Sequence, residues 1–255
     1  MQLALDLPPA RTKFRHGGAR PGAGRPAKKR QPGDPLPHVA RPKVDRHKPS
    51  HVTLRLVRGI PSLEKQLLLT RVRRALAAAR REAEKKGAGF QIVEFKVEQN
   101  HLHLVVEAKS AKGMSSGVAG LEVRIARAVN SALRRKGKVF ADRYHRRDLS
   151  TPTEVKNVLS YVLNNARKHV RHIGQVAYVD ASSSGESFDG WSEPVEVYRW
   201  LDEDIEPWPQ VKAWTWLLAK GWRKRGLISP FAVPGTRRTN QSREGLRPEP
   251  GARRR

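Results

Sequence analysis

The segment FQIVEFKVEQNHLHLVVEA, residues 90–108, contains two runs in which apolar and polar residues alternate. Alternation with a period of two, together with many Val, Ile and Phe residues, is typical of β-strands. Only Gln99 and Asn100 separate the two runs, and this loop length predicts a β-hairpin. We therefore expect a β-sheet whose remaining strands come from the flanking sequence.

The sequence on both sides of this hairpin supplies the other elements of an α+β fold. HVTLRLV, residues 51–57, alternates like a strand, and residues 138–149 contain a further short strand candidate. Apolar residues at three- and four-residue spacing predict helices at about residues 62–86 and 115–135. Strand, helix, two strands, helix, strand is the ferredoxin-like βαββαβ order, which predicts one antiparallel sheet with helices on one face.

A third helix is predicted at about residues 152–170, after this repeat. Thr151 has the side chain of an N-cap residue, Pro152 suits the first helical position, and Glu154 completes a capping box. Beyond residue 174 the periodicity is lost, and all six tryptophans lie between residues 191 and 222. These tryptophans either pack as an aromatic unit on the domain or offer a stacking surface for bases.

The composition divides the chain into four parts. Residues 1–50 and 233–255 are rich in Arg, Pro and Gly, and we expect both to be basic disordered tails. Residues 51–173 hold the predicted strands and helices, and residues 174–232 form a Trp-rich extension.

The first tail contains GGARPGAGRP, residues 17–26, with two Arg-Pro pairs. Arg20 and Arg25 are candidate DNA-binding residues, because an extended Arg-Pro segment resembles an AT-hook that inserts arginines into a narrow minor groove. A solvated basic linker is the alternative interpretation of the same residues.

The charge of the chain indicates a polyanionic partner. Lys and Arg number 51 against 24 Asp and Glu, for a formal net charge of +27. Nucleic-acid backbones are the most common partner of such a protein, and no apolar stretch reaches the length needed to span a membrane. The chain has no cysteine, which excludes disulfides, cysteine-ligated zinc and thiol catalysis. Because MQLALDLPPA also lacks the pattern of a secretory signal, we expect a cytoplasmic, nucleoid-associated protein.

Two histidines in the second strand of the hairpin could bind a metal ion. His101 and His103 are two residues apart, so their side chains share one face of the strand. Two imidazoles on one face form half of a divalent-metal site. A pair of half-exposed histidines without a ligand is the alternative.

The third helix contains a second set of candidate residues. Tyr161 and Asn165 are four residues apart and therefore lie on the same helical face. Lys168 lies one further turn along this face, where it could hold a phosphate or simply be an exposed lysine near the helix C-terminus. A helix tyrosine taken alone is more often a packing residue than a nucleophile.

The order of these motifs resembles that of the HUH endonuclease superfamily, in particular the single-tyrosine transposases and the REP-associated tyrosine transposases, which act on repetitive extragenic palindromes. The resemblance covers about residues 50–172 and is carried by HVTLRL (51–56), NHLHLVVE (100–107), GKVFADRYH (137–145) and YVLNNARKH (161–169). It implies that His101 and His103 are metal ligands, that Tyr161 is the nucleophile, and that Asn165 completes the metal shell. Asn at this last position, where other branches usually have Gln, is similar to the branch associated with extragenic palindromes.

The resemblance also implies an activity. The expected enzyme is a metal-dependent tyrosine transposase and single-stranded DNA endonuclease that uses Mg²⁺ or Mn²⁺. Tyr161 would attack single-stranded, hairpin or palindromic DNA, forming a 5′-phosphotyrosine link and a free 3′-hydroxyl that can reverse the step without ATP. Relatives include monomers and homodimers, and the sequence leaves both states open.

Three alternative functions agree with parts of the sequence. A catalytically inactive DNA-hairpin-binding protein would use the basic surface alone, and a structural nucleoid protein would explain the charge. An RNA-binding module would need aromatic side chains on the sheet, where the predicted strands offer Phe90 and Phe95.

Overall fold

The computed structural model describes residues 41–87, 89–169, 177–198 and 208–234. The two ends of the chain, including Arg20 and Arg25, therefore lie outside the described residues. None of the described helices combines the length and the apolar character needed to cross a membrane.

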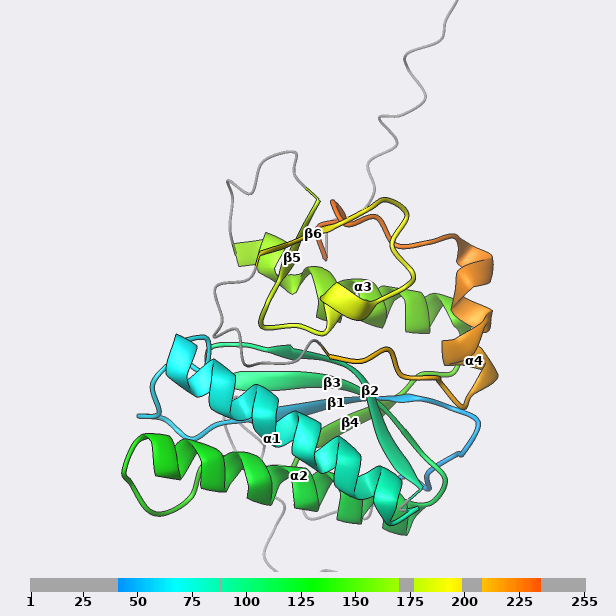
Figure 1. Ribbon diagram of the computed structural model, residues 1–255. Helices are drawn as coiled ribbons and strands as arrows, with labels where there is room; N and C mark the ends of the chain where they lie inside the picture. The colour runs from blue at the N-terminus through cyan, green and yellow to red at the C-terminus, as the bar shows by residue number, and fades with distance from the viewer. Residues whose placement is uncertain (1–40, 88, 170–176, 199–207, 235–255) are drawn as a thin grey trace, which may run out of the picture. The chain divides into compact units, whose positions relative to one another are not determined.

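A four-stranded sheet forms the centre of the fold (Figure 1). Its strands are β1 (Ser50–Arg55), β2 (Phe90–Val97), β3 (His101–Ala108) and β4 (His145–Asp148). They lie in the order β2-β3-β1-β4, and each neighbouring pair is antiparallel. The predicted hairpin is the β2–β3 pair, and the predicted ferredoxin-like order is confirmed.

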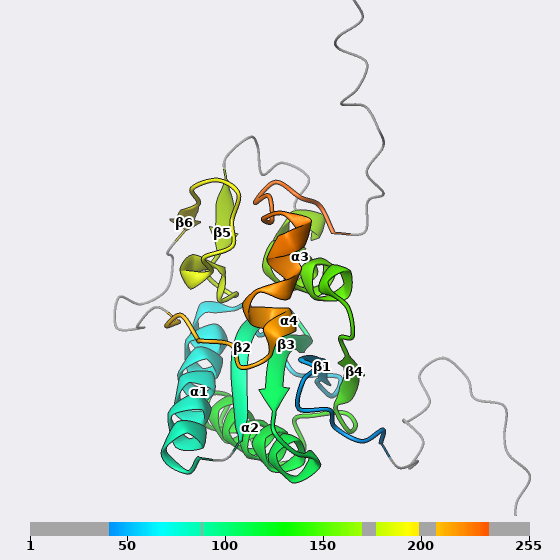
Figure 2. The ribbon, with the colours of Figure 1, turned by 90° about the vertical axis from the view of Figure 1, so that its right-hand side faces the viewer.

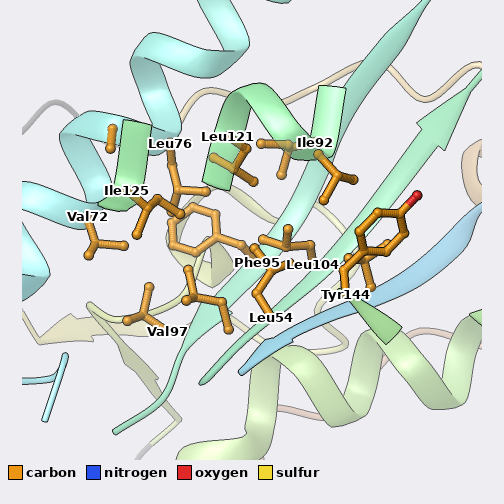
Figure 3. Packing of buried hydrophobic residues seen from close by; sticks show 14 of the residues in the cluster. Leu54, Val72, Leu76, Ile92, Phe95, Val97, Leu104, Leu121, Ile125 and Tyr144 are labelled. Carbon is orange, nitrogen blue, oxygen red and sulfur yellow. The ribbon is translucent and has the colours of Figure 1, made fainter. Parts of the chain in front are cut away.

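Helices α1 (Gln66–Lys85) and α2 (Ala111–Ala132), the two helices of the βαββαβ repeat, cover one face of this sheet (Figures 1 and 2). Alternate strand residues such as Leu54, Phe95 and Leu104 point into the layer between sheet and helices (Figure 3). The packing is tight enough that a Cβ at Gly117 of α2 would come within 2.2 Å of the Phe90 ring. Both aromatic residues of the predicted strands are thus buried, so Phe90 and Phe95 offer no stacking surface for RNA bases.

Helix α3 (Pro152–His169) packs on the opposite face of the sheet, against Val93 of β2 and Val105 of β3. Its N-terminus has the predicted capping box, because Thr151 Oγ1 accepts from Glu154 N at 3.2 Å and Glu154 Oε2 accepts from Thr151 N at 3.2 Å. The sheet therefore has α1 and α2 on one side and α3 on the other. The third helix lies outside the βαββαβ repeat, which explains why it is not confined to the face of the other two.

The segment after α3 packs on the same domain. It comprises β5 (Tyr178–Asp180), β6 (Glu196–Tyr198), α4 (Trp216–Ala219) and the 3-10 helices η1 (Gly185–Ser187) and η2 (Gly221–Arg225). Val97 N donates to Ser182 O at 2.8 Å and Ser184 N donates to Phe95 O at 3.1 Å, so residues 182–184 pair with the outer edge of β2. An edge strand with unpaired backbone groups is thereby covered.

Three predicted boundaries differ from the structure. Residues 62–65 form a turn before α1 begins at Gln66. Helix α2 begins at Ala111, earlier than expected, because Ser110 Oγ accepts from Gly113 N at 3.0 Å and caps it despite the helix-disfavouring glycines. Of residues 138–149, only His145–Asp148 pair with β1 as a strand.

Most of the described tryptophans agree with the packing interpretation, and the expected stacking surface for bases stays a prediction. Trp208 and Trp222 are buried in the two apolar clusters, whereas Trp214 and Trp216 are 44% and 52% exposed. Trp191 is partly buried and packs edge-on against Phe188, and Trp200 lies outside the described residues. The extension is therefore mainly a packing unit, with two tryptophans accessible at its surface.

Candidate active site

His101 and His103 lie on the face of β3 that carries α3. The neighbouring residues Leu102 and Leu104 fill the core on the α1 and α2 side, so the period of two directs both imidazoles to the other face. His101 Nε2 and His103 Nε2 lie 2.9 Å apart, with the two rings nearly perpendicular. The two nitrogens thus converge on one point.

Tyr161 of α3 reaches the same point. Its hydroxyl oxygen lies 3.3 Å from His103 Nε2, and the two ring centroids are 5.0 Å apart. His103 therefore contacts both His101 and Tyr161, and these are three of the four residues on which the sequence prediction rests. A nucleophile and the paired imidazoles lie within the reach of one phosphate group.

The opposite ring nitrogens are held by three further residues. Asn100 Oδ1 lies 2.7 Å from His101 Nδ1, and it accepts a hydrogen bond from this nitrogen. His103 Nδ1 lies 3.1 Å from His51 Nε2 and 3.3 Å from Thr53 Oγ1, two side chains of β1. With its proton at Nδ1, each neutral imidazole presents a lone pair at Nε2, which is the form that binds a metal ion.

Asn165 lies one turn after Tyr161 and is 2% exposed. Its Nδ2 donates to Glu98 Oε1 at 2.6 Å. Its Oδ1 has no hydrogen-bond partner among the residues that the structure describes. Glu98 in turn donates its backbone N–H to His101 O at 2.9 Å, which connects Asn165 to the histidine strand. A buried amide oxygen without a partner requires an explanation, and a bound ion is one.

Burial keeps the side chains of His103 and His51 uncharged at neutral pH. It lowers the pKa of His103 to about 3, assisted by the positive potential of His51, His101 and Lys96. It lowers the pKa of His51 to about 4, assisted by His145 and Arg147. Burial also raises the pKa of the Tyr161 phenol, and the nearby Glu98 carboxylate raises it further. At neutral pH the His103 imidazole is therefore neutral and able to act as a ligand, whereas the phenol stays protonated unless a cation offsets Glu98.

The donor atoms fit a divalent metal ion of the Mg²⁺ or Mn²⁺ class. Two imidazole nitrogens and an amide oxygen leave open coordination positions, as a site that also binds phosphate oxygens requires. No cluster of three or more His, Cys, Asp or Glu side chains arranged to hold a metal occurs within the described ranges. The set His101, His103 and Asn165 is not such a cluster, because its third donor is an amide.

The three candidate DNA-binding residues remain predictions. Arg20 and Arg25 lie outside the described residues, and the side chain of Lys168 is not described either, although its backbone is part of α3. Strand β4 instead places His145 opposite Thr53 and Arg147 opposite His51, so an exposed histidine and an exposed arginine border the site.

Sequence analysis alone missed His51, Thr53, Asn100 and Glu98. His51 and Thr53 lie on the polar face of the predicted strand at residues 51–57, so strand alternation was the available signal. Asn100 was interpreted only as part of a hairpin loop. Glu98 belongs to the alternating set Glu94, Lys96 and Glu98, which a period of two assigns to solvent as readily as to a site.

Part of the chain matches a known family. Residues 55–165 match the family described as "Transposase IS200 like". This stretch of the chain resembles the IS200-like transposases. The match runs from the end of β1 to Asn165 and covers a little under half of the chain. The predicted resemblance to the single-tyrosine transposases is thereby confirmed.

Two solved structures are similar to the chain. One is a REP-associated tyrosine transposase bound to a REP hairpin, with 15% identity over 52% of this chain and 74% of the other, at a TM-score of 0.42. The other is a candidate transposase from Deinococcus radiodurans R1, with 19% identity over 48% of this chain and 87% of the other, at a TM-score of 0.29. These superpositions are loose, so the assignment rests on the family match. No curated protein matches the chain.

Proposed function

We propose that this protein is a transposase that cleaves and rejoins single-stranded or hairpin DNA, with Tyr161 as the nucleophile. The contact between the Tyr161 hydroxyl and His103, at 3.3 Å, is the observation that carries the proposal. The net charge of +27 supports a polyanionic substrate, and the exposed Arg147 on β4 is suited to contact its backbone.

The chemistry balances without an external energy source. The Tyr161 oxygen forms a bond to the scissile phosphorus, and the bond from phosphorus to the 3′-oxygen breaks. The phenolic proton is lost, the departing 3′-oxygen takes up a proton, and the 5′-phosphate remains linked to the tyrosine. The reverse attack by a 3′-hydroxyl, from the same or another strand, restores the phosphodiester and frees Tyr161.

His101, His103 and Asn165 would hold Mg²⁺ or Mn²⁺. When bound, such an ion withdraws charge from the scissile phosphate and offsets the negative charge that develops there. Thr53, His51 and Asn100 orient the imidazoles, and the packing of α3 on the sheet aims the phenol. The DNA must be single-stranded at the cleavage point, because a stacked duplex keeps its backbone out of reach of the buried site.

The test compares wild type with Tyr161→Phe, which removes one oxygen and keeps the ring. Both proteins are incubated with labelled single-stranded hairpins and Mn²⁺, and covalent adducts are resolved on denaturing gels. We expect wild type to form an adduct and Tyr161→Phe to form none while binding the hairpin with unchanged affinity. Cleavage by Tyr161→Phe at the same phosphate would instead favour a metal-activated water. Hairpin binding by wild type without adduct or cleavage would favour an inactive DNA-binding protein.

A further inference from the structure

Glu98 connects the two halves of the site. It follows the last residue of β2, its side chain is 5% exposed, and its Oε1 accepts from Asn165 Nδ2 at 2.6 Å. Its backbone N–H donates to His101 O at 2.9 Å. One residue of the hairpin therefore contacts both the strand that carries the histidines and the helix residue proposed as the third ligand.

The chemistry of this contact fixes the orientation of the Asn165 amide. A primary amide has two donors on its nitrogen and an acceptor oxygen, whereas a carboxylate only accepts. Glu98 can therefore bind the nitrogen of Asn165 but not its oxygen, and the amide cannot flip without losing a short, charge-assisted hydrogen bond. Oδ1 must then face away from Glu98.

The oxygen that is left over is the unusual part of the arrangement. Asn165 Oδ1 is buried and has no partner among the described residues. Leaving a buried polar atom unpaired is unfavourable, so an orientation that creates such an atom needs a compensating interaction. A cation beside His101 and His103 supplies that interaction, since an amide oxygen is a suitable donor for Mg²⁺ or Mn²⁺.

We propose that Glu98 is a positioning residue that holds Asn165 with its oxygen toward the metal, and so sets metal affinity without binding the metal itself. This inference rests on the proposed function, because it takes Asn165 as a ligand. Glu98 acts through Asn165. It is therefore neither a fourth metal ligand nor a carboxylate that only stabilises the fold.

The test measures Mn²⁺ affinity of the full chain by electron paramagnetic resonance, without DNA. Glu98→Leu keeps a similar volume but cannot accept a hydrogen bond, and we expect its Mn²⁺ affinity to fall by ~10- to 100-fold, the usual effect of losing a residue that orients a ligand. Glu98→Gln retains a carbonyl oxygen that accepts the same hydrogen bond, so its affinity should stay within a few-fold of wild type. If Glu98→Gln weakens binding as much as Glu98→Leu, Glu98 is itself a ligand and the positioning role is overturned. Glu98→Ala replaces Glu98→Leu if thermal unfolding shows that the leucine variant does not fold.

A double-mutant cycle tests whether Glu98 acts through Asn165. In an Asn165→Ala background the amide is gone, so adding Glu98→Leu should leave Mn²⁺ affinity unchanged from the single Asn165→Ala variant. A further loss of the same size as in wild type would show that Glu98 acts independently, contrary to the proposal.

Glu107→Gln is the matched control. Glu107 is 1% exposed and lies on the same sheet face, but its oxygens accept from Trp214 N and Thr215 N instead of from a site residue. This variant should lower the melting temperature and leave Mn²⁺ affinity unchanged, and a loss of affinity would show that any buried carboxylate on this face has the same effect. If wild type and Glu98→Leu bind Mn²⁺ with equal affinity, the positioning role of Glu98 is wrong, but the proposed function still stands. Wild type that neither binds Mn²⁺ nor forms a DNA adduct overturns the proposed function as well.

Discussion

Neighbouring side chains hold the Nδ1 atoms of the two histidine rings of the site. His101 has Asn100, whereas His103 has both His51 and Thr53 on the neighbouring strand. Each partner can accept the Nδ1 proton and so leave Nε2 free to act as a ligand. The second partner of His103 makes the loss of either one tolerable.

This redundancy predicts a non-additive effect on metal binding. His51→Ala and Thr53→Val should each weaken Mn²⁺ binding by only a few-fold, because the other partner still orients His103. The double variant should lose ~10- to 100-fold. Titration with Mn²⁺ measures the affinities, and His47→Ala, at an exposed position near β1, is the control. Wild-type affinity in the double variant would show that the packing of the ring alone orients His103.

The depressed pKa values of the histidines predict a dependence of stability on pH. His51 titrates near 4 in the folded protein and near 6.5 when unfolded, so its contribution is complete above about 6.5 and is lost as the pH falls through about 4. Metal-free wild type should therefore lose stability relative to His51→Gln between pH 7 and pH 4.5. Urea unfolding at both pH values measures this difference, and a constant difference would mean that His51 is solvated in solution.

At the level of whole elements, β2 marks the limit of what the sequence could predict. Its alternation predicted the strand correctly, but Glu94, Lys96 and Glu98 also alternate and look like a solvent face. The structure buries all three. Lys96 binds Asp180 and Ser182, and Glu94 binds Ser184, 84 to 90 residues later in the chain, and no local periodicity predicts that this segment pairs with a strand edge.

The sequence likewise predicts some residues of the candidate site and not others. The spacing of His101 and His103 on a strand, and of Tyr161 and Asn165 on a helix, is local, so the sequence could predict which side chains share a face. That these two faces meet follows from the family pattern. The contacts of His51 and Glu98 depend on strand register and on the packing of α3 on the sheet, which spacing alone does not determine.

Burial of Glu94 in β2 predicts a dependence of stability on pH that is opposite to that of His51. Burial raises its pKa to about 8, against about 4.5 when unfolded. Its favourable contribution is therefore present below about 4.5 and is lost as the pH rises through about 8. Glu94→Gln should become more stable relative to wild type between pH 5 and pH 8.5, by a few degrees in melting temperature. An unchanged difference across this range would show that Glu94 is ionised in the folded protein.

The whole domain depends on the segment after α3, beyond the part that matches the family. Asp180 and Ser182 bind the buried Lys96, and the backbone at residues 214 and 215 binds the buried Glu107. Arg73 of α1, which is also buried, donates to Ala181 O and Ser183 O. Removing the segment would leave three charged side chains without these partners.

A truncation tests this dependence. A fragment of residues 41–173 should fail to unfold cooperatively, because uncovering or unpairing a buried charge costs about 3–5 kcal/mol. The fragment of residues 41–234 should unfold in one transition at a temperature close to that of the full chain. Circular dichroism during heating compares the two, and a cooperative transition of the shorter fragment at the same temperature would show that residues 51–173 fold independently.

The covalent link between Tyr161 and DNA is the centre of this account, and peptide mass spectrometry tests it most directly. Wild type is incubated with a single-stranded hairpin and Mn²⁺, the DNA is digested to nucleotides, and the protein is cleaved with trypsin. Cleavage after Lys156 and Arg167 releases NVLSYVLNNAR, residues 157–167, which contains Tyr161 as its only tyrosine. We expect this peptide to gain the mass of a nucleotide attached through its 5′-phosphate, and we expect fragmentation to place the nucleotide on Tyr161. DNA cleavage with the peptide unmodified, or with the nucleotide on another residue, would contradict it.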